Sequence, residues 1–99
     1  MQKLALHQIT MMDGGTEDLV RFAAGAGLDR VCLFTATPVD NHGRDMFPTV
    51  RPAEVSFFTT LLNDLDVQII NAEYFPVMAE CDVSVYLPAV ALAAELQAR

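Results

Sequence analysis

With 99 residues, of which 53% are hydrophobic, and a positive mean hydropathy, the chain has enough apolar material for one packed domain, which excludes intrinsic disorder. Its formal charge of -7 comes from 13 acidic and 6 basic residues, and the basic ones are scattered, so the concentrated basic face that nucleic-acid binding requires is missing. No apolar run approaches the roughly 20 residues of a membrane span, and we expect neither a membrane nor a nucleic-acid partner.

The cysteines and the N-terminus bear on location. Cys32 lies in an apolar segment and Cys81 in a polar one, and two such dissimilar cysteines do not indicate a disulfide framework. The N-terminus lacks the longer apolar core and the small-residue cleavage site of a signal peptide. We therefore expect a reduced, cytoplasmic protein.

The first predicted unit is a strand followed by a helix. Residues 3–9 are short and aliphatic and end before a glycine turn, which indicates a strand. Thr16 begins a predicted helix over residues 16–26, since its hydroxyl can accept a free backbone N–H and two acidic residues in the first turn suit the helix dipole. Gly27 is placed to cap the end of this helix.

The second unit has the same order. Residues 29–34 contain a nearly continuous apolar run, as in strands buried on both faces of a sheet. The connection from Thr35 to Val50 is long for a strand-to-helix loop, which usually takes about 2–6 residues, and such loops often meet ligands. A helix is predicted over residues 52–65, with Pro52 in its first turn.

The third unit repeats the pattern. Residues 66–72 form the predicted third strand, and Asp82 caps a predicted helix over residues 83–98. Pro88 lies inside that segment and kinks the helix or marks its true start, which predicts a short turn followed by the main helix.

The order is therefore βαβαβα, which predicts a parallel α/β sheet with right-handed crossovers. The pair Leu28-Asp29 and the pair Leu65-Asp66 each lead from a helix into an apolar strand, which supports repeated units. Three parallel strands leave two open edges and do not close a barrel. We expect residues 1–99 to be one partial barrel-like domain that is a fragment of a larger fold or that assembles with another chain.

Three segments resemble the N-terminal portion of xylose-isomerase-like TIM barrels, the superfamily of sugar (phosphate) isomerases and epimerases. They are residues 4–10 (LALHQIT), residues 19–31 (LVRFAAGAGLDRV) and residues 67–76 (VQIINAEYFP). The resemblance implies the first three units of a (β/α)8 barrel, with the active site at the carboxyl ends of the strands. It implies an isomerase of carbohydrate metabolism that acts on a sugar or polyol.

In that family a divalent metal, Mn or Mg, is bound mostly by Glu, Asp and His of later strands, and paired Glu residues move protons beside a carbonyl. Those strands are absent from this chain, so no metal ligand is assigned to it. The resemblance therefore implies a segment that supplies substrate-side contacts and does not catalyse alone, which leaves enzymatic activity of the chain itself open.

His7 and Glu73 are the candidate catalytic residues because each lies at the end of a predicted strand. The His7 imidazole can act as an acid or base near neutral pH, or hold substrate hydroxyls. A buried Glu73 carboxylate beside aromatic residues would have a raised pKa, which suits acid–base chemistry. The alternatives are a hydrogen-bonded structural histidine and a carboxylate that caps a loop amide.

Further residues are candidate substrate contacts. Because side chains alternate along a strand, either His7 or Gln8 points into the interior of the barrel. Asn71, two positions before Glu73, lies on the same side of its strand as Glu73. In the long loop, the Arg44 guanidinium can bind a phosphate or carboxylate, and the His42 imidazole can assist it. The alternative is that both are ordinary solvated charges of a surface loop. The candidates are Gln8, Asn71, His42, Arg44 and Phe75.

The sequence also allows two other interpretations. His7, His42 and Glu73 would make a three-ligand metal set of plausible type, although their spacing is not diagnostic. The chain would also fit a non-catalytic α/β module that forms a homo-oligomer, or pairs with another chain, through its open sheet edges.

Overall fold

A computed structural model describes residues 4–11, 14–37, 41–73, 75, 79 and 82–98. The main elements, in chain order, are β1 (Leu6–His7), α1 (Thr16–Gly25), β2 (Arg30–Phe34), α2 (Val55–Leu65), β3 (Gln68–Glu73) and α3 (Leu87–Glu95). Three 3-10 helices accompany them, η1 (Gln8–Met11), η2 (Pro52–Glu54) and η3 (Val83–Tyr86). Cys81 lies outside the described residues, as do Lys3 at the start of the predicted first strand and the C-terminal Arg99.

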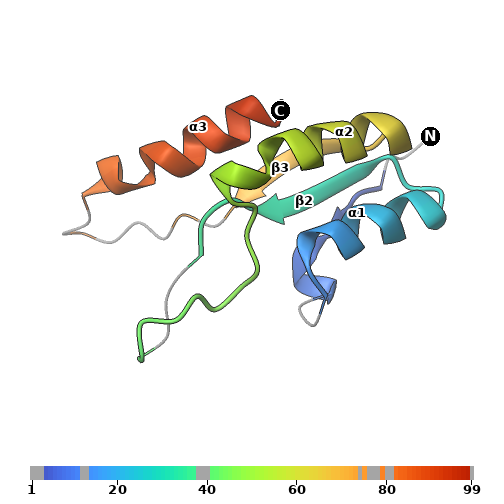
Figure 1. Ribbon diagram of the computed structural model, residues 1–99. Helices are drawn as coiled ribbons and strands as arrows, with labels where there is room; N and C mark the ends of the chain where they lie inside the picture. Colours follow the sequence, from blue (N-terminus) through green and yellow to red (C-terminus); the bar gives the residue numbers. More distant parts are fainter. Residues whose placement is uncertain are drawn as a thin grey trace.

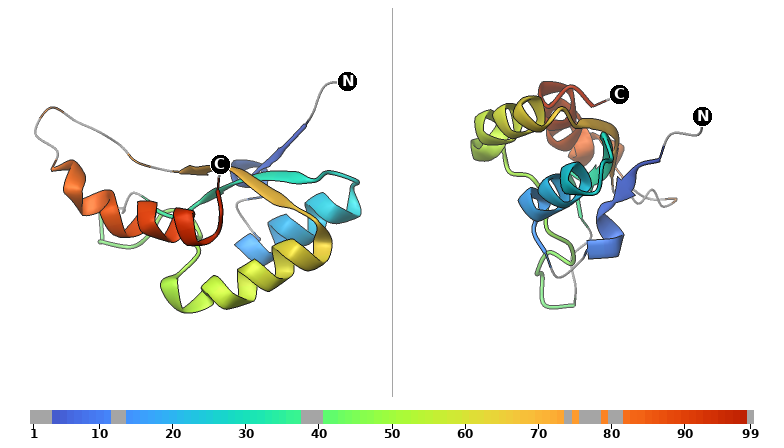
Figure 2. Two further views of the ribbon diagram at one scale, coloured as in Figure 1. Left: turned by 90° about the horizontal axis from the view of Figure 1, so that it is seen from above. Right: turned by 90° about the vertical axis from the view of Figure 1, so that its right-hand side faces the viewer.

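The three strands form one parallel sheet in the order β1-β2-β3, which confirms the predicted βαβαβα arrangement (Figure 1). Leu6 pairs with Val31, and Val31 pairs with Ile69. The register shifts after Val31, so that Cys32 pairs with Asn71. The helices lie on one side of this sheet (Figure 2), and none of the described helices is long and apolar enough to cross a membrane.

The hydrophobic core lies between the sheet and the helices. Val31, Leu33 and Ile69 face it from the strands. The helices, together with the residue that follows α3, contribute the other main core residues, which are Leu19, Val20, Ala23, Phe58, Leu61, Leu62, Leu92 and Leu96. Because side chains alternate along a strand, Cys32 and Phe34 point to the opposite face. We call this second side, which the helices do not cover, the open face.

All three helices end in the same way. Gly27, Asp66 and Gln97 follow the helices with φ angles of 81°, 54° and 60°, in the left-handed region. In each case the next residue donates its N–H to a carbonyl five positions back, as in a Schellman motif. These bonds are Leu28 N to Ala23 O at 2.8 Å, Val67 N to Leu62 O at 2.9 Å and Ala98 N to Ala93 O at 3.0 Å. The predicted cap at Gly27 is thus confirmed.

The helix starts agree only in part with the prediction. Gly15, not Thr16, is the N-cap of α1, and the Thr16 hydroxyl is buried without a hydrogen-bond partner among the residues described. Asp82 caps the 3-10 turn η3 and not the main helix that was predicted to follow it, since its carboxylate accepts the Ser84 N–H at 3.0 Å and α3 begins after Tyr86. Pro88 stands in the first turn of α3, after η3, so it marks the true start of that helix.

The first strand is shorter than predicted because local hydrogen bonds turn the chain after His7. The Ile9 N–H donates to His7 Nδ1 at 3.0 Å, and the Thr10 hydroxyl donates to the His7 carbonyl at 2.7 Å. Side-chain bonds of this kind compete with pairing along a strand. The segment after His7 is therefore a 3-10 turn instead of the second half of a strand.

Candidate functional site

Two of the predicted residues meet at the carboxyl ends of the strands. His7 Nε2 lies 2.7 Å from Glu73 Oε1, and the two side chains are 34% and 25% exposed. His7 pairs with Cys32 in the register of the sheet, and Glu73 pairs with Phe34. Since these two β2 residues point away from the helices, His7 and Glu73 project from the open face with them.

The His7 ring is fixed in its orientation and in its neutral tautomer. Its Nδ1 accepts the Ile9 N–H, so that nitrogen carries no proton in the neutral ring. The proton is then on Nε2, which donates to the Glu73 carboxylate. The edge of the ring also packs on Phe34, with ring centroids 5.9 Å apart and planes 77° apart.

Asn71 completes a small group around Glu73. Its Nδ2 donates to Glu73 Oε1 at 2.8 Å, the same oxygen that His7 contacts. The other carboxylate oxygen makes no hydrogen bond to any residue that the structure describes. We call His7, Asn71 and Glu73 the strand-end cluster; it has one free carboxylate oxygen with which to accept a hydrogen bond or a proton.

Gln8 has a different place from the one predicted. Its side chain is 0% exposed, and both of its polar atoms are used within the protein. Gln8 Nε2 donates to the Pro48 carbonyl at 2.7 Å, and Gln8 Oε1 accepts the Phe34 N–H at 2.9 Å. Phe47 stacks on Phe34 nearby, at 4.8 Å and 17°. Gln8 thus joins the end of β2 to the loop, and its role in substrate binding stays a prediction.

The other predicted contacts are not part of the strand-end cluster. His42 and Arg44 are exposed residues of the loop between β2 and α2, and the hydrogen bonds that define the strand-end cluster join His7, Asn71 and Glu73. Phe75 packs edge-on against Tyr86 of η3, with ring centroids 5.2 Å apart. The structure therefore brings together three of the seven predicted residues.

Sequence reasoning did not include Cys32 among the site residues. It lies on β2 in register with both His7 and Asn71, and it is partly exposed. Burial and, second, the negative charge of Glu73 raise the pKa of the Cys32 thiol. Its position between two core residues in the apolar run of β2 was the available signal, because it predicts a side chain on the opposite face.

The side chains do not form a metal site by themselves. Among the residues described, no three His, Cys, Asp or Glu side chains gather closely enough to bind a metal ion, and His7, His42 and Glu73 do not come together as a ligand set. The cluster offers one imidazole and one carboxylate that already bond to each other, whereas Mg²⁺ takes about six ligands. The strand-end cluster therefore does not fit Mn or Mg as it stands.

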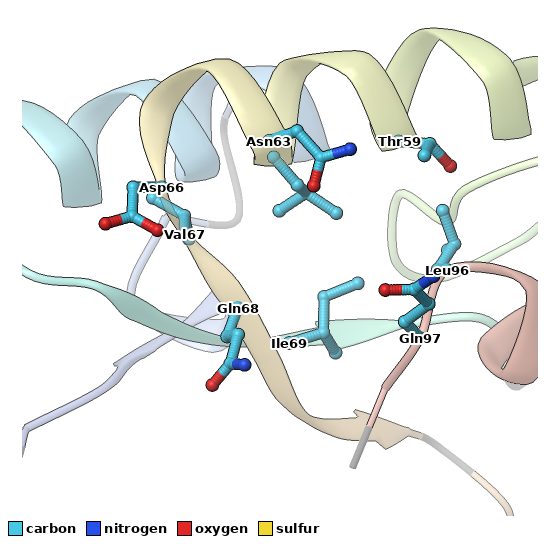
Figure 3. Close-up of a pocket in the computed structure, with 9 residues that line it drawn as sticks. Thr59, Asn63, Asp66, Val67, Gln68, Ile69, Leu96 and Gln97 are labelled. Atoms are coloured by element: carbon cyan, nitrogen blue, oxygen red, sulfur yellow. The ribbon is translucent and has the colours of Figure 1, made fainter.

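A hollow of about 220 Å³ lies at the other end of the sheet (Figure 3). Gln68 and Ile69 at the amino end of β3 line it, together with Asn63 of α2 and Leu96 after α3. The strand-end cluster is at the carboxyl end, so this hollow is not part of the site.

The strand-end cluster can donate hydrogen bonds to a ligand hydroxyl and accept them from it, and Glu73 can accept a proton. No protein-family model and no curated protein matches the sequence, so sequence comparison adds no family to this geometry.

Proposed function

We propose that the chain is the first three strand–helix units of a sugar isomerase- or epimerase-like barrel and that the strand-end cluster contacts a sugar or polyol substrate. The observation that carries the proposal is the 2.7 Å contact between His7 Nε2 and Glu73 Oε1 at the carboxyl ends of β1 and β3. In parallel barrels, active sites lie at this end of the strands. A reduced, cytoplasmic location belongs to the same proposal.

The chemistry of the cluster suits a hydroxyl-bearing ligand. The free oxygen of Glu73 accepts a hydrogen bond from one hydroxyl, while its other oxygen stays fixed by His7 and Asn71. In isomerisation this carboxylate would take the proton from the carbon beside the carbonyl and return it to the neighbouring carbon, while the His7 and Asn71 N–H groups hold its other oxygen in place. The reaction also needs groups from later strands, so in this proposal the chain binds but does not catalyse alone.

Binding is tested by titrating the chain with D-fructose and D-xylulose while following the His7 and Asn71 signals by NMR. We expect saturable shifts that Glu73→Gln removes. Glu95→Gln is the matched control, because Glu95 is an exposed glutamate at the end of α3. Shifts that persist in Glu73→Gln, or that are absent from the native chain, would contradict the proposal.

Activity is tested separately with a panel of ketoses and added Mn²⁺ or Mg²⁺. We expect no turnover by this chain alone. Turnover that survives both His7→Ala and Glu73→Gln would mean that the site is elsewhere.

A second candidate function is self-association, as a non-catalytic module. The observation that favours it is an apolar surface over η3 and α3, where Val83, Val85, Leu87 and Val90 are all more than half exposed. Such surfaces are typical of interaction sites. Size-exclusion chromatography with light scattering tests it: we expect a dimer or larger that Leu87→Asp dissociates, and a native monomer would contradict it.

A further inference from the structure

Helix α3 is apolar on two opposite sides. Leu92 faces the core and is 6% exposed. Leu87, Val90, Ala91 and Ala94 are all exposed, and their spacing of three and four residues places them along the side of the helix that points away from the core. We call these four residues the α3 stripe. A helix that is apolar on both sides is normally covered on both sides, so the α3 stripe is a contact surface.

The α3 stripe lies in an uncharged part of an acidic chain. Residues 83–94 contain no Asp, Glu, Lys or Arg, although the chain has a net charge of -7. Two copies of such a chain repel each other, and they approach most easily through a surface that carries no carboxylates. A basic partner, in contrast, would find no carboxylate to pair with here. The absence of charge therefore favours a second copy of the chain as the occupant.

The order of large and small residues in the α3 stripe indicates how the two copies are oriented. Leu87 and Val90 lie in the first half of the stripe, and Ala91 and Ala94 lie in the second half. In an antiparallel pair, Leu87 of one copy faces Ala94 of the other, and the two-fold axis passes between Val90 and Ala91. A large residue thus meets a small one at each end, which allows close packing. A parallel pair would place leucine against leucine and leave a gap between the alanines.

Glu95 favours the same orientation. This exposed carboxylate is the last residue of α3, so a parallel pair would bring the two copies of it together. In the antiparallel pair the two carboxylates are about 13 Å apart along the helix axes, at 1.5 Å per residue. That separation exceeds the Debye length of about 8 Å in physiological salt, so their repulsion is largely screened.

We propose that two copies of the chain form a closed dimer in which the two α3 helices pack antiparallel through the α3 stripe. A two-fold arrangement of this kind uses the same surface of both copies, so association stops at the dimer. The proposal rests on the self-association given above as the second candidate function, and it does not depend on substrate binding by the strand-end cluster.

The experiment is sedimentation velocity of the full chain between about 10 µM and 1 mM, the range of the weak complexes that small interfaces form. We expect a monomer–dimer equilibrium in the native chain. Leu87→Lys and Ala94→Asp should each weaken it by at least about ten-fold, because each variant buries an unpaired charge. An equimolar mixture of the two variants should restore the dimer, since the new lysine then faces the new aspartate. Only the antiparallel pair brings these two positions together.

Two further variants control for effects outside α3. Phe22→Lys introduces the same charge at a 58% exposed position of α1 and should leave the dimer unchanged. In a background of Cys32→Ser and Cys81→Ser, Ala91→Cys should form a disulfide-linked dimer under mild oxidation, because this position lies at the two-fold axis. Ala26→Cys, at an exposed alanine after α1, should not. Circular dichroism confirms that each variant is folded.

The outcomes separate this dimer from self-association in general. If the native chain is a dimer but Leu87→Lys leaves it intact, the α3 arrangement is wrong and self-association uses another surface. A mixture of Leu87→Lys and Ala94→Asp that stays monomeric, or Ala91→Cys that does not cross-link, overturns the antiparallel orientation. A native chain that is monomeric up to 1 mM overturns this proposal and the second candidate function together.

Discussion

His7 Nε2 and Glu73 Oε1 lie 2.7 Å apart although the residues are 66 positions apart in the chain. The contact follows from the topology, because β1 and β3 flank β2 in parallel and therefore end at the same edge of the sheet. Two features of the backbone position the pair. The Ile9 N–H orients the His7 imidazole, and the pairing of Glu73 with Phe34 in the sheet sets where the carboxylate lies along the strands.

The tautomer of His7 is the first prediction. Neutral His7 should carry its proton on Nε2, because Nδ1 accepts the Ile9 N–H and Nε2 faces Glu73. Two-bond ¹H–¹⁵N spectra of the neutral ring, recorded in mildly alkaline solution, measure this directly. His42 is the other histidine of the chain, so His42→Ala assigns the signals. A proton found mainly on Nδ1 would contradict the geometry of the site.

Gln8 should be important for stability. Gln8→Ala leaves the Phe34 N–H and the Pro48 carbonyl without their partner inside the protein and also opens a cavity. We expect a loss of about 2–4 kcal/mol in the free energy of unfolding, measured with urea. Gln68→Ala, at an exposed position of β3, should change it by less than about 0.5 kcal/mol. Equal effects of the two substitutions would refute the role of Gln8 as a buried link.

The sequence predicts the sheet better than the site. The predicted strand over residues 29–34 differs from β2 by one residue at its start. The prediction succeeds because a short apolar run such as Val31 to Phe34 is buried on both faces when it forms a central strand of a parallel sheet. β1 was predicted too long, since aliphatic content does not reveal that the His7 ring and carbonyl both bond to the residues that follow.

The site shows the same limit. The positions of His7 and Glu73 at strand ends are visible in the sequence, so both could be named. The buried position of Gln8 could not be predicted, because its hydrogen-bond partners lie 26 and 40 residues away in the chain and depend on how the loop folds over β2. Side-chain alternation predicts that His7 and Gln8 point in opposite directions, but it does not predict which polar groups are available as hydrogen-bond partners on each side.

The helix ends give a third prediction. Gln97 takes a left-handed conformation that costs an L residue with a Cβ about 1–2 kcal/mol, whereas Gly27 takes it without that cost. Gln97→Gly should therefore stabilise the protein by about 0.5–1 kcal/mol, and Gly27→Ala should destabilise it by about 1 kcal/mol. Thermal or urea unfolding measures both. If the two changes have the same sign, the shared Schellman ends are not as described.

Cys32 gives the fourth prediction, which links the sheet to the charge of Glu73. Burial and the Glu73 carboxylate both raise the pKa of the thiol, so at neutral pH the reactive thiolate is scarcer than at an ordinary cysteine. In a Cys81→Ser background, alkylation of Cys32 by iodoacetamide should be slow, with a pH midpoint above the ordinary value of 9.0. Glu73→Gln should lower that midpoint only in part, because burial is the larger cause.

The same shift has a consequence for stability. The folded state disfavours the thiolate, so the contribution of Cys32 is complete below the thiol pKa of the unfolded chain and is lost as the pH rises through the raised pKa of the folded chain. The free energy of unfolding should therefore fall in alkaline solution, and Cys32→Ala should flatten that slope. Glu95→Gln, far from the strand-end cluster in the sequence, should move neither the alkylation midpoint nor the slope. An alkylation midpoint that Glu73→Gln leaves unmoved would show that the carboxylate does not act on the thiol across the open face.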